Sequence, residues 1–398
     1  MLLYWIWYAQ LTGISQRAKA ELLMHFSDPE DLFFAEAETL QPLVSADQLQ
    51  YLLERDLKEA EKILAQCRRK EIGILPFSDR AYPEKLRNIA DPPMVLYYKG
   101  QLPDWDVQPV IGLVGTRKAS AYGLQVANQL GGELARCGAA VISGGADGAD
   151  AQGMWGALQQ EGTVICVLGG GVDVIYPRCN RRLFAQTEEN GCLLSEYPPE
   201  TAAIGWHFPQ RNRIISGISD GVIVVEAPEK SGALNTAHHA LEQERDLYAV
   251  PANIGVSSGA GSNQLLLEKA QAVLSGWDVV KRYAHLYPRA VREQGSFKSR
   301  RPEDIQAKVA QKPVIPEKLP EKVIDNSENS TYSELENTKP AFDQEEQEIF
   351  ALLDHRPQHP DAIAARSVLP SARVQAILTK LTVKGVVKFH PGGRVSLK

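Results

Sequence analysis

The sequence is poor in the cysteine patterns on which disulfide frameworks and structural zinc sites depend. It has five cysteines in 398 residues, an odd number, and no two of them form a Cys-x-x-Cys pair. Small disulfide-linked domains and zinc ribbons rely on such closely spaced pairs. The cysteine content therefore favours a reducing compartment, and we predict a cytoplasmic protein.

Long hydrophobic runs are absent as well. No stretch of 18 apolar residues occurs, whereas a helix that crosses a bilayer needs about 20. The apolar segment Met1–Leu11 carries no basic residue and is not followed by a small-residue cleavage site. We interpret it as an amphipathic helix of a domain rather than as a signal peptide, and we predict no membrane insertion.

Fingerprints of common cofactors are also missing. The first strand of the central region is followed by Gly115-Thr116-Arg117 instead of Gly-x-Gly-x-x-Gly, so a nicotinamide cofactor is poorly supported. His238 and His239 are adjacent, and on a helix they would point to different faces. We therefore predict neither a cofactor nor a bound metal ion.

An overall positive charge, which many nucleic-acid-binding proteins carry, is absent too. The formal net charge is −6, and residues 107–282 contain 13 Lys and Arg against 17 Asp and Glu. Seven of these 13 cations nevertheless gather in three predicted loops, namely Arg117, Lys118, Arg178, Arg181, Arg182, Arg211 and Arg213. A polyanion would have to bind this local patch; solvated surface arginines are the alternative.

From Pro109 onward, short apolar runs alternate with longer amphipathic stretches. The runs are Val110–Val114, Ala139–Ser143, Thr163–Leu168, Cys192–Ser195, Gly221–Glu226 and Asp246–Val250. The helix-like stretches are 122–136, 149–160, 180–190, 208–219, 235–244 and 263–269. This alternation is typical of an α/β protein with a doubly wound, Rossmann-like parallel sheet, whose strands are apolar throughout because helices cover both faces.

Regions of different composition flank this core. Residues 1–75 predict a small helical domain of SAM or helix-hairpin type, with helix starts at Ser15, Asp28 and Ser45. Its turn at residues 11–15 could contact a phosphate backbone or only pack. Residues 76–290 form the predicted Rossmann-like domain, and residues 291–340, rich in Lys, Glu and Pro, predict a disordered linker.

The last predicted domain, residues 341–398, combines helical stretches at 344–353, 361–366 and 371–383 with a Gly-containing hairpin at 386–397. Three helices followed by a hairpin describe a winged helix. Arg373, Gln375 and Lys380 lie on its third helix, which is the helix that reads DNA in such domains. Duplex DNA and a protein partner are both open as its ligand.

Ligands of open parallel sheets bind beyond the carboxyl ends of the strands, and five strand-end loops here carry residues suited to phosphate. Glycines and hydroxyls at helix starts offer backbone N–H groups, arginines offer bidentate contacts, and Phe208, with Trp206, offers a stacking face. The candidate binding residues are Gly115, Thr116, Arg117, Ser143, Gly144, Gly145, Asn180, His207, Phe208, Arg211, Asn212, Arg213, Ser231, Gly232 and Thr236. We interpret Asp147 and Asp150 as helix caps rather than as a metal pair.

These blocks resemble the DNA-processing protein A family, also called DprA or Smf. The matching stretches are 114–123, 142–153, 168–180, 194–198, 208–220 and 225–237, and the run FPQRNRIISGISDG is the most specific. The resemblance implies a dimeric protein, not an enzyme, that binds single-stranded DNA and delivers incoming strands to the RecA recombinase in natural transformation. It assigns DNA contacts to Arg117 and to the segment with Phe208, Arg211 and Arg213.

The sequence departs from the family before the Phe-Pro pair. Members often carry a basic residue there, whereas this chain has Gly205-Trp206-His207. The alternative function is a nucleotide-hydrolysing enzyme of the lysine-decarboxylase-like Rossmann type, with Glu196 or Glu226 as a general acid or base. No Glu follows Thr236 to complete that enzyme's motif.

Overall fold

A nine-stranded sheet organises the larger part of this computed structural model, which describes residues 1–293 and part of residues 349–397. Its order is β1-β2-β6-β5-β4-β3-β7-β8-β9. The strands are β1 (Gly73–Pro76), β2 (Val95–Gly100), β3 (Val110–Val114), β4 (Ala140–Ser143), β5 (Val164–Val167), β6 (Gly191–Ser195), β7 (Gly221–Val224), β8 (Asp246–Ala249) and β9 (Gln271–Ala272). From β6 to β9 all neighbours are parallel, which confirms the predicted doubly wound sheet.

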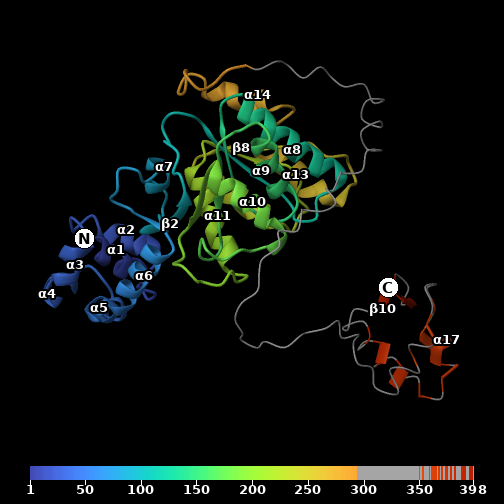
Figure 1. Cartoon of the computed structure of the whole chain (residues 1–398), viewed down its shortest axis with the longest axis horizontal. Coiled ribbons are helices and arrows are strands. Elements are labelled where there is room, and N and C mark those ends of the chain that lie inside the picture. Colours follow the sequence, from blue (N-terminus) through green and yellow to red (C-terminus); the bar gives the residue numbers. More distant parts are fainter. Residues whose placement is uncertain are drawn as a thin grey trace, which may run out of the picture. The chain divides into compact units, whose positions relative to one another are not determined.

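Helices cover both faces of the sheet (Figure 1). One face packs against α8 (Ala121–Arg136), α9 (Ala149–Leu158), α10 (Arg181–Glu189) and α14 (Gly276–Val280). The other packs against α7 (Glu84–Arg87), α11 (His207–Ile218), α12 (Gly232–Glu242) and α13 (Ala260–Glu268). Successive strand residues point to opposite faces, so both sets of side chains in the central strands β3 to β7 are buried, and these strands are apolar at almost every position.

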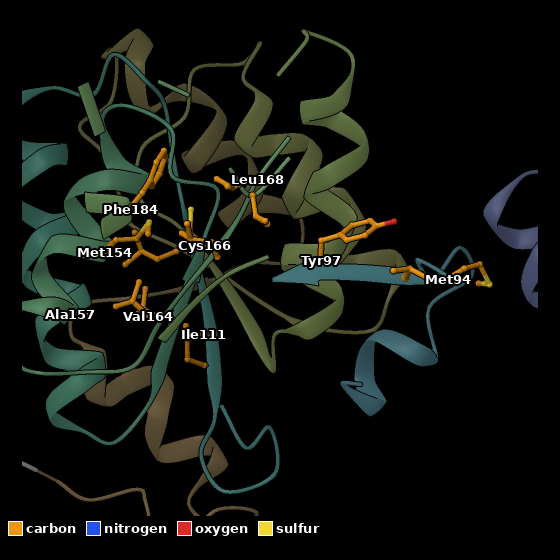
Figure 2. Close-up of a cluster of buried hydrophobic side chains, with 14 of the residues drawn as sticks. Met94, Tyr97, Ile111, Met154, Ala157, Val164, Cys166, Leu168 and Phe184 are labelled. Atoms are coloured by element: carbon orange, nitrogen blue, oxygen red, sulfur yellow. The ribbon is translucent and has the colours of Figure 1, made fainter. Parts of the chain in front are cut away.

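The two hydrophobic clusters alternate along each strand. In β5, Val164 and Cys166 belong to the first cluster, whereas Ile165 and Val167 belong to the second. Figure 2 shows Val164 and Cys166 beside Met154 of α9. These side chains are fully buried, and burying each large apolar side chain stabilises the fold by about 1.5–3 kcal/mol.

The N-terminal region is helical, as predicted. Its helices are α1 (Leu2–Gln10), α2 (Gln16–Leu22), α3 (Pro29–Phe34), α4 (Ala37–Leu40), α5 (Ala46–Leu53) and α6 (Lys58–Arg69). Ser15 and Asp28 cap α2 and α3 through their side-chain oxygens, and Ser45 forms a capping box with Gln48. All three predicted helix starts are therefore real N-caps.

The sheet begins earlier than the sequence pattern indicated. Residues 73–75, which the pattern placed in the helical region, lie in β1, and β1 pairs antiparallel with β2. β2 then pairs antiparallel with β6, so the Pro-rich lead-in widens the sheet by two strands. These pairings join residues that are distant in the sequence, and a short apolar run does not indicate which strand it will pair with.

The chain divides into two units, Met1–Asp304 and Ile305–Lys398. In the second, α17 (Pro360–Ala364) agrees with the predicted second helix. The strands β10 (Val387–His390) and β11 (Arg394–Leu397) form the predicted antiparallel hairpin. The other two predicted helices lie largely, and the predicted linker almost entirely, outside the described residues. Within the described part of the chain, no helix is both long and apolar enough to cross a membrane.

Candidate functional site

The strand order reverses between β3 and β7. From β3 the chain proceeds outward through β4, β5 and β6, and then returns to place β7, β8 and β9 on the other side. At such a switch point the loops after the two central strands diverge and leave a crevice. A cavity of about 560 Å³ occupies this position, and we call it the switch-point cavity. Its walls include residues 114–118 after β3 and residues 228–236 after β7.

Nine of the predicted binding residues line this cavity together. They are Gly115, Thr116, Arg117, Phe208, Arg211, Asn212, Ser231, Gly232 and Thr236. They come from two loops and the first turns of α11, which are far apart in the sequence and meet at the carboxyl edge of the sheet. The convergence expected from the strand-end pattern is therefore present for the loops after β3 and β7 and for the start of α11.

Arg117 and Phe208 form the exposed face of the switch-point cavity. Arg117 is exposed, and its guanidinium carbon lies 5.2 Å from the centre of the Phe208 ring. The centre of the Tyr176 ring lies 5.5 Å from that of the Phe208 ring, and Tyr176 is 44% exposed. Within the described residues, Arg117 has no ion pair with a carboxylate. An accessible guanidinium beside two ring faces can bind a phosphate and stack a base.

Arg211 lies beneath this face rather than on it. Its side chain is buried, and its guanidinium donates to the carbonyls of Gly144, at 2.7 Å, and Val167. Its Nε donates to Asn212 Oδ1 at 3.1 Å. Burial lowers the pKa of Arg211, while nearby Asp150 opposes that shift. Arg211 therefore ties together the ends of β4 and β5 and supports Phe208, whose ring centre is 5.9 Å away.

Asp150 contributes the carboxylate of the switch-point cavity. It does not cap its own helix, because the N-cap of α9 is Gly148. Instead its Oδ1 accepts a hydrogen bond from the Gly115 N–H at 3.2 Å. Burial raises the pKa of this carboxyl, and Arg211 partly offsets the effect. The prediction of a helix cap was thus wrong for Asp150: the carboxylate holds the loop after β3.

The backbone of that loop is largely occupied. The N–H groups of Thr116 and Ser120 donate to the Glu226 carbonyl and carboxylate, at 2.8 and 2.9 Å. Lys118 N–H donates to Thr116 Oγ1 at 3.3 Å. The sequence pattern suggested that strand-end N–H groups would hold phosphates. Here they hold the loop instead, which leaves the side chain of Arg117 as its most available donor.

Five predicted residues lie behind the cavity wall or on its far side. Ser143 is buried and donates to the Leu113 carbonyl at 2.6 Å. Asn180 is buried and donates to the Gly145 carbonyl at 3.0 Å. Gly144 accommodates the Arg211 guanidinium, since a Cβ there would lie 2.4 Å from Nη2. Gly145, with φ +63°, and His207, bonded to Gly169, also stay outside the lining.

Arg213 is separated from the other arginines. It is buried and binds Glu196 through both terminal nitrogens, at 2.9 and 2.8 Å. A second carboxylate, that of Asp91, lies 3.0 Å from its Nε. These contacts raise the pKa of Arg213 despite its burial. The structure therefore does not bring Arg213 to the switch-point cavity, and its charge is already neutralised.

At the opposite wall, Ser231 caps α12 by accepting from the Ala233 N–H at 3.3 Å. The helix begins at Gly232, three residues before the predicted start. A Cβ built on Gly232 meets nothing within 4 Å, so space lies in front of this helix terminus. Thr236 is buried, and Asn212 donates to the Gly232 carbonyl at 3.2 Å.

Four charged or aromatic residues of the lining were not among the predicted binding residues: Lys118, Asp150, Tyr176 and Lys230. Lys118 and Lys230 are exposed cations at the two walls. Lys118 was visible as a neighbour of Arg117, but Lys230 lies in a loop that was considered only for its Ser and Gly. No group of three or more potential metal-ligating side chains occurs among the described residues.

Comparison with known proteins identifies the chain. Residues 73–284 match the family model described as DNA recombination-mediator protein A, and residues 333–393 match the DprA winged helix domain. DNA processing protein DprA of Bacillus subtilis is 42% identical over 59% of this chain and 80% of its own length. Protein Smf of Synechocystis is 31% identical over 98% of this chain and 97% of its own length.

A solved structure agrees with these sequence matches. The X-ray structure of DNA processing protein A from Streptococcus pneumoniae superposes with a TM-score of 0.62 at 30% identity, and the alignment covers 71% of this chain and 98% of that one. The chain belongs to the DNA recombination-mediator protein A family, the DprA or Smf proteins.

Proposed function

We propose that this protein binds single-stranded DNA in the switch-point cavity, protects incoming DNA and loads the RecA recombinase during natural transformation in the cytoplasm. The observation that carries the proposal is the exposed Arg117 above Phe208, at the point where the strand order reverses. Lys118 and Lys230 add positive charge at the two walls. Family membership supports a role in DNA processing.

In this proposal Arg117 binds a phosphate and Phe208 stacks a base. Arg211 acts through Phe208 and the ends of β4 and β5, because it is buried and bonded to their carbonyls. Arg178, Arg181 and Arg182, exposed on η1 (Arg178–Asn180) and the start of α10, extend the positive surface beyond Tyr176. The acidic body of the protein then matters little, since the local field is positive.

We propose further that binding proceeds without covalent chemistry. Glu226 is buried, and its carboxylate accepts from the backbone N–H and the hydroxyl of Ser120, at 2.9 and 3.0 Å. It thereby stabilises the N-terminus of α8. Glu196 is paired with Arg213. Both candidate general acids of the hydrolase alternative have structural partners, so neither is placed to transfer a proton to a nucleotide in the cavity.

A homodimer is part of the proposal. Leu267 and Leu274 are 82% and 81% exposed on either side of β9. Among the described strands, β9 pairs only with β8 and therefore forms an edge of the sheet. An edge strand flanked by exposed apolar side chains suits a second copy of the same chain. Two cavities per dimer would hold one strand more firmly than one cavity.

The test is fluorescence anisotropy with a labelled oligo-dT and with duplex of equal length, over a salt series. We expect salt-sensitive binding that strongly favours the single strand. Arg117→Ala should lose about ten-fold to a hundred-fold in affinity, because a charged hydrogen bond contributes about 1.5–3 kcal/mol. The slope of log affinity against log salt should fall by about 0.7.

Arg289→Ala is the matched control. Arg289 is exposed, and the nearby Tyr287 bonds Asp220, which precedes β7, so this arginine belongs to the opposite edge of the sheet. Its removal should leave affinity unchanged. Equal binding of duplex, or full affinity in Arg117→Ala, would contradict the proposal. Release of free base from a nucleoside monophosphate would favour the hydrolase alternative.

Loading of RecA needs a separate assay. Single-stranded DNA covered by a single-stranded-DNA-binding protein resists RecA, so the initial rate of RecA ATP hydrolysis on such DNA reports loading. Addition of this protein should raise that rate, whereas Arg117→Ala should not. An equal rate with and without the protein would remove RecA from the proposed function.

A further inference from the structure

A second cavity, of about 1160 Å³, lies between the N-terminal helices and the sheet region, and we call it the N-terminal cavity. The turn between α1 and α2, with Thr12, and the start of α2, with Arg17, form one wall. The segment from β6 to α11, with Trp206, and one side of α12, with His239, form the other. None of the contacts described for the switch-point cavity accounts for it.

The two cavities adjoin along the start of α11. Phe208 lines the switch-point cavity, whereas the two preceding residues, Trp206 and His207, line the N-terminal cavity. Pro209 and Asn235 line both. Three consecutive ring-bearing residues therefore span the boundary between the cavities.

The ring of Trp206 is exposed and packs on a buried neighbour. It is 59% exposed, whereas His207 beneath it is buried. The His207 ring stacks on Tyr197 at 3.9 Å and meets the Trp206 ring edge-on at 4.2 Å. His207 Nδ1 is also 2.9 Å from the Gly169 carbonyl oxygen. A fixed, accessible aromatic face of this kind is what stacks unpaired bases.

The charges of the N-terminal cavity suit bases better than phosphates. Two of its cations are committed: Lys19 donates to the Ala9 carbonyl at 2.9 Å, and Arg213 pairs with Glu196. Exposed carboxylates, those of Glu242 and Glu244, also line the sheet side. Carboxylates repel phosphates, but they accept hydrogen bonds from the exocyclic amino groups of cytosine and the purines, which thymine lacks.

We infer that a single strand held at Arg117 continues across Trp206 and places its next bases in the N-terminal cavity, with a preference for amino-bearing bases over thymine. This inference rests on the proposed function, since it extends the same bound strand. Arg17, the exposed cation of the helical wall, is placed to meet the backbone of that extension. The N-terminal helices thus form part of the DNA-binding surface.

The test measures the affinity gained by lengthening an oligonucleotide. An oligo-dT of about six nucleotides fits the range of sites on small single-strand-binding folds, and it is compared with the same oligomer extended by about three cytidines or thymidines at either end. In the wild type, cytidines at one end should raise affinity about five-fold or more, and thymidines less. Trp206→Ala should lose that gain, and its effect on the short oligomer should be much smaller than that of Arg117→Ala.

A matched pair of variants tests the helical wall. Arg17→Glu and Lys62→Glu each reverse the charge of an exposed residue paired with a glutamate one helical turn away. Only Arg17 lines the N-terminal cavity. Arg17→Glu should reduce the gain from the extension several-fold, and Lys62→Glu should not.

The outcomes separate this inference from the proposed function. If the wild type binds the short oligomer but gains nothing from either extension, or if Trp206→Ala keeps the whole gain, the inference is overturned and the proposed function stands. An equal loss in Arg17→Glu and Lys62→Glu also overturns it. If the wild type binds none of the oligomers, both fail.

Discussion

Three arginines, Arg117, Arg211 and Arg213, look equivalent in the sequence, yet each has a different environment in the structure. Arg117 is exposed beside Phe208, Arg211 is buried against carbonyls, and Arg213 is buried against carboxylates. An arginine already paired with a carboxylate offers little to a phosphate, because binding would first have to break that pair. Affinity for DNA should therefore depend on Arg117 directly, and on the other two only through the fold.

Removal of Arg213 should reduce stability more than any direct contact with DNA. Arg213→Met leaves the carboxylate of Glu196, only 13% exposed, without its partner, so we expect a loss of about 3 kcal/mol in the free energy of unfolding, measured by urea denaturation. The double variant Arg213→Met, Glu196→Met should recover part of that loss. Arg117→Ala should change stability by less than about 0.5 kcal/mol. A stable Arg213→Met protein with a reduced salt dependence of DNA binding would instead make Arg213 a phosphate contact.

Lys19 gives the stability a distinctive dependence on pH. Burial lowers the pKa of its amine from 10.5 to about 8. Between these values the unfolded chain holds a proton that the folded chain has lost, so stability rises with pH in this window. We would measure the free energy of unfolding of the wild type and of Lys19→Met in urea between about pH 7.5 and 9. As the pH rises, the wild type should gain stability relative to Lys19→Met. The slope is at most about 1.4 kcal/mol per pH unit.

The comparison with Lys19→Met isolates this group from others that titrate nearby. Burial raises the pKa of Cys67 from 9.0 to about 11, and such thiols reduce stability as the pH rises above 9, because only the unfolded chain then ionises. Both proteins contain these thiols, so their effect cancels in the difference. A difference that stays constant with pH would contradict the lowered pKa of Lys19.

Elements of the central sheet could be predicted from the sequence because their signals are local. The apolar runs located the strands β3 to β8 to within one or two residues, and hydroxyl or carboxylate caps located α2, α3 and α5. The strand β1 was missed, since four residues ending in proline carry little pattern and their pairing with β2 is settled by tertiary contacts.

The candidate site was predictable in its position but not in its internal contacts. Glycines mark the ends of the strands in the sequence, and the parallel topology brings those strand ends to one edge of the sheet. The separation of Arg213 from Arg117 depends on Asp91, 122 residues away in the chain, and on Glu196. Likewise the occupation of the loop amides depends on Glu226, 106 residues from Ser120. No local pattern encodes such partners.

Two glycine substitutions should distinguish helix packing from ligand access. A Cβ on Gly131 of α8 would lie 1.9 Å from the carbonyl oxygen of Gly153 in α9. Gly131→Ala should therefore destabilise the fold, by about 1–3 kcal/mol. A Cβ on Gly232 meets nothing, so Gly232→Ala should leave stability unchanged or slightly raised.

The same variants bear on DNA binding. If a strand approaches the start of α12 closely, Gly232→Ala should weaken binding of single-stranded DNA although the fold is intact. Thermal unfolding and anisotropy on the same preparations separate the two effects. Unchanged affinity in Gly232→Ala would move the bound strand away from α12 and toward Arg117 and Phe208.

For the molecule as a whole, the charge and apolar surfaces lie in different places. The cations gather at the carboxyl edge of the sheet around the switch-point cavity, whereas the exposed leucines lie at the β9 end. DNA binding and self-association can therefore be changed separately.

Leu267→Glu together with Leu274→Glu tests this separation. The two leucines are more than 80% exposed, so the substitutions should cost little folding free energy, but a buried carboxylate pair would disrupt an apolar interface. We expect sedimentation velocity to show a dimer for the wild type and a monomer for the variant. Affinity for the short oligo-dT should be nearly unchanged, whereas affinity for a strand long enough to reach two cavities should fall, because the second binding event is no longer intramolecular. A wild type that sediments as a monomer, or a variant that remains dimeric, would assign these leucines to another surface.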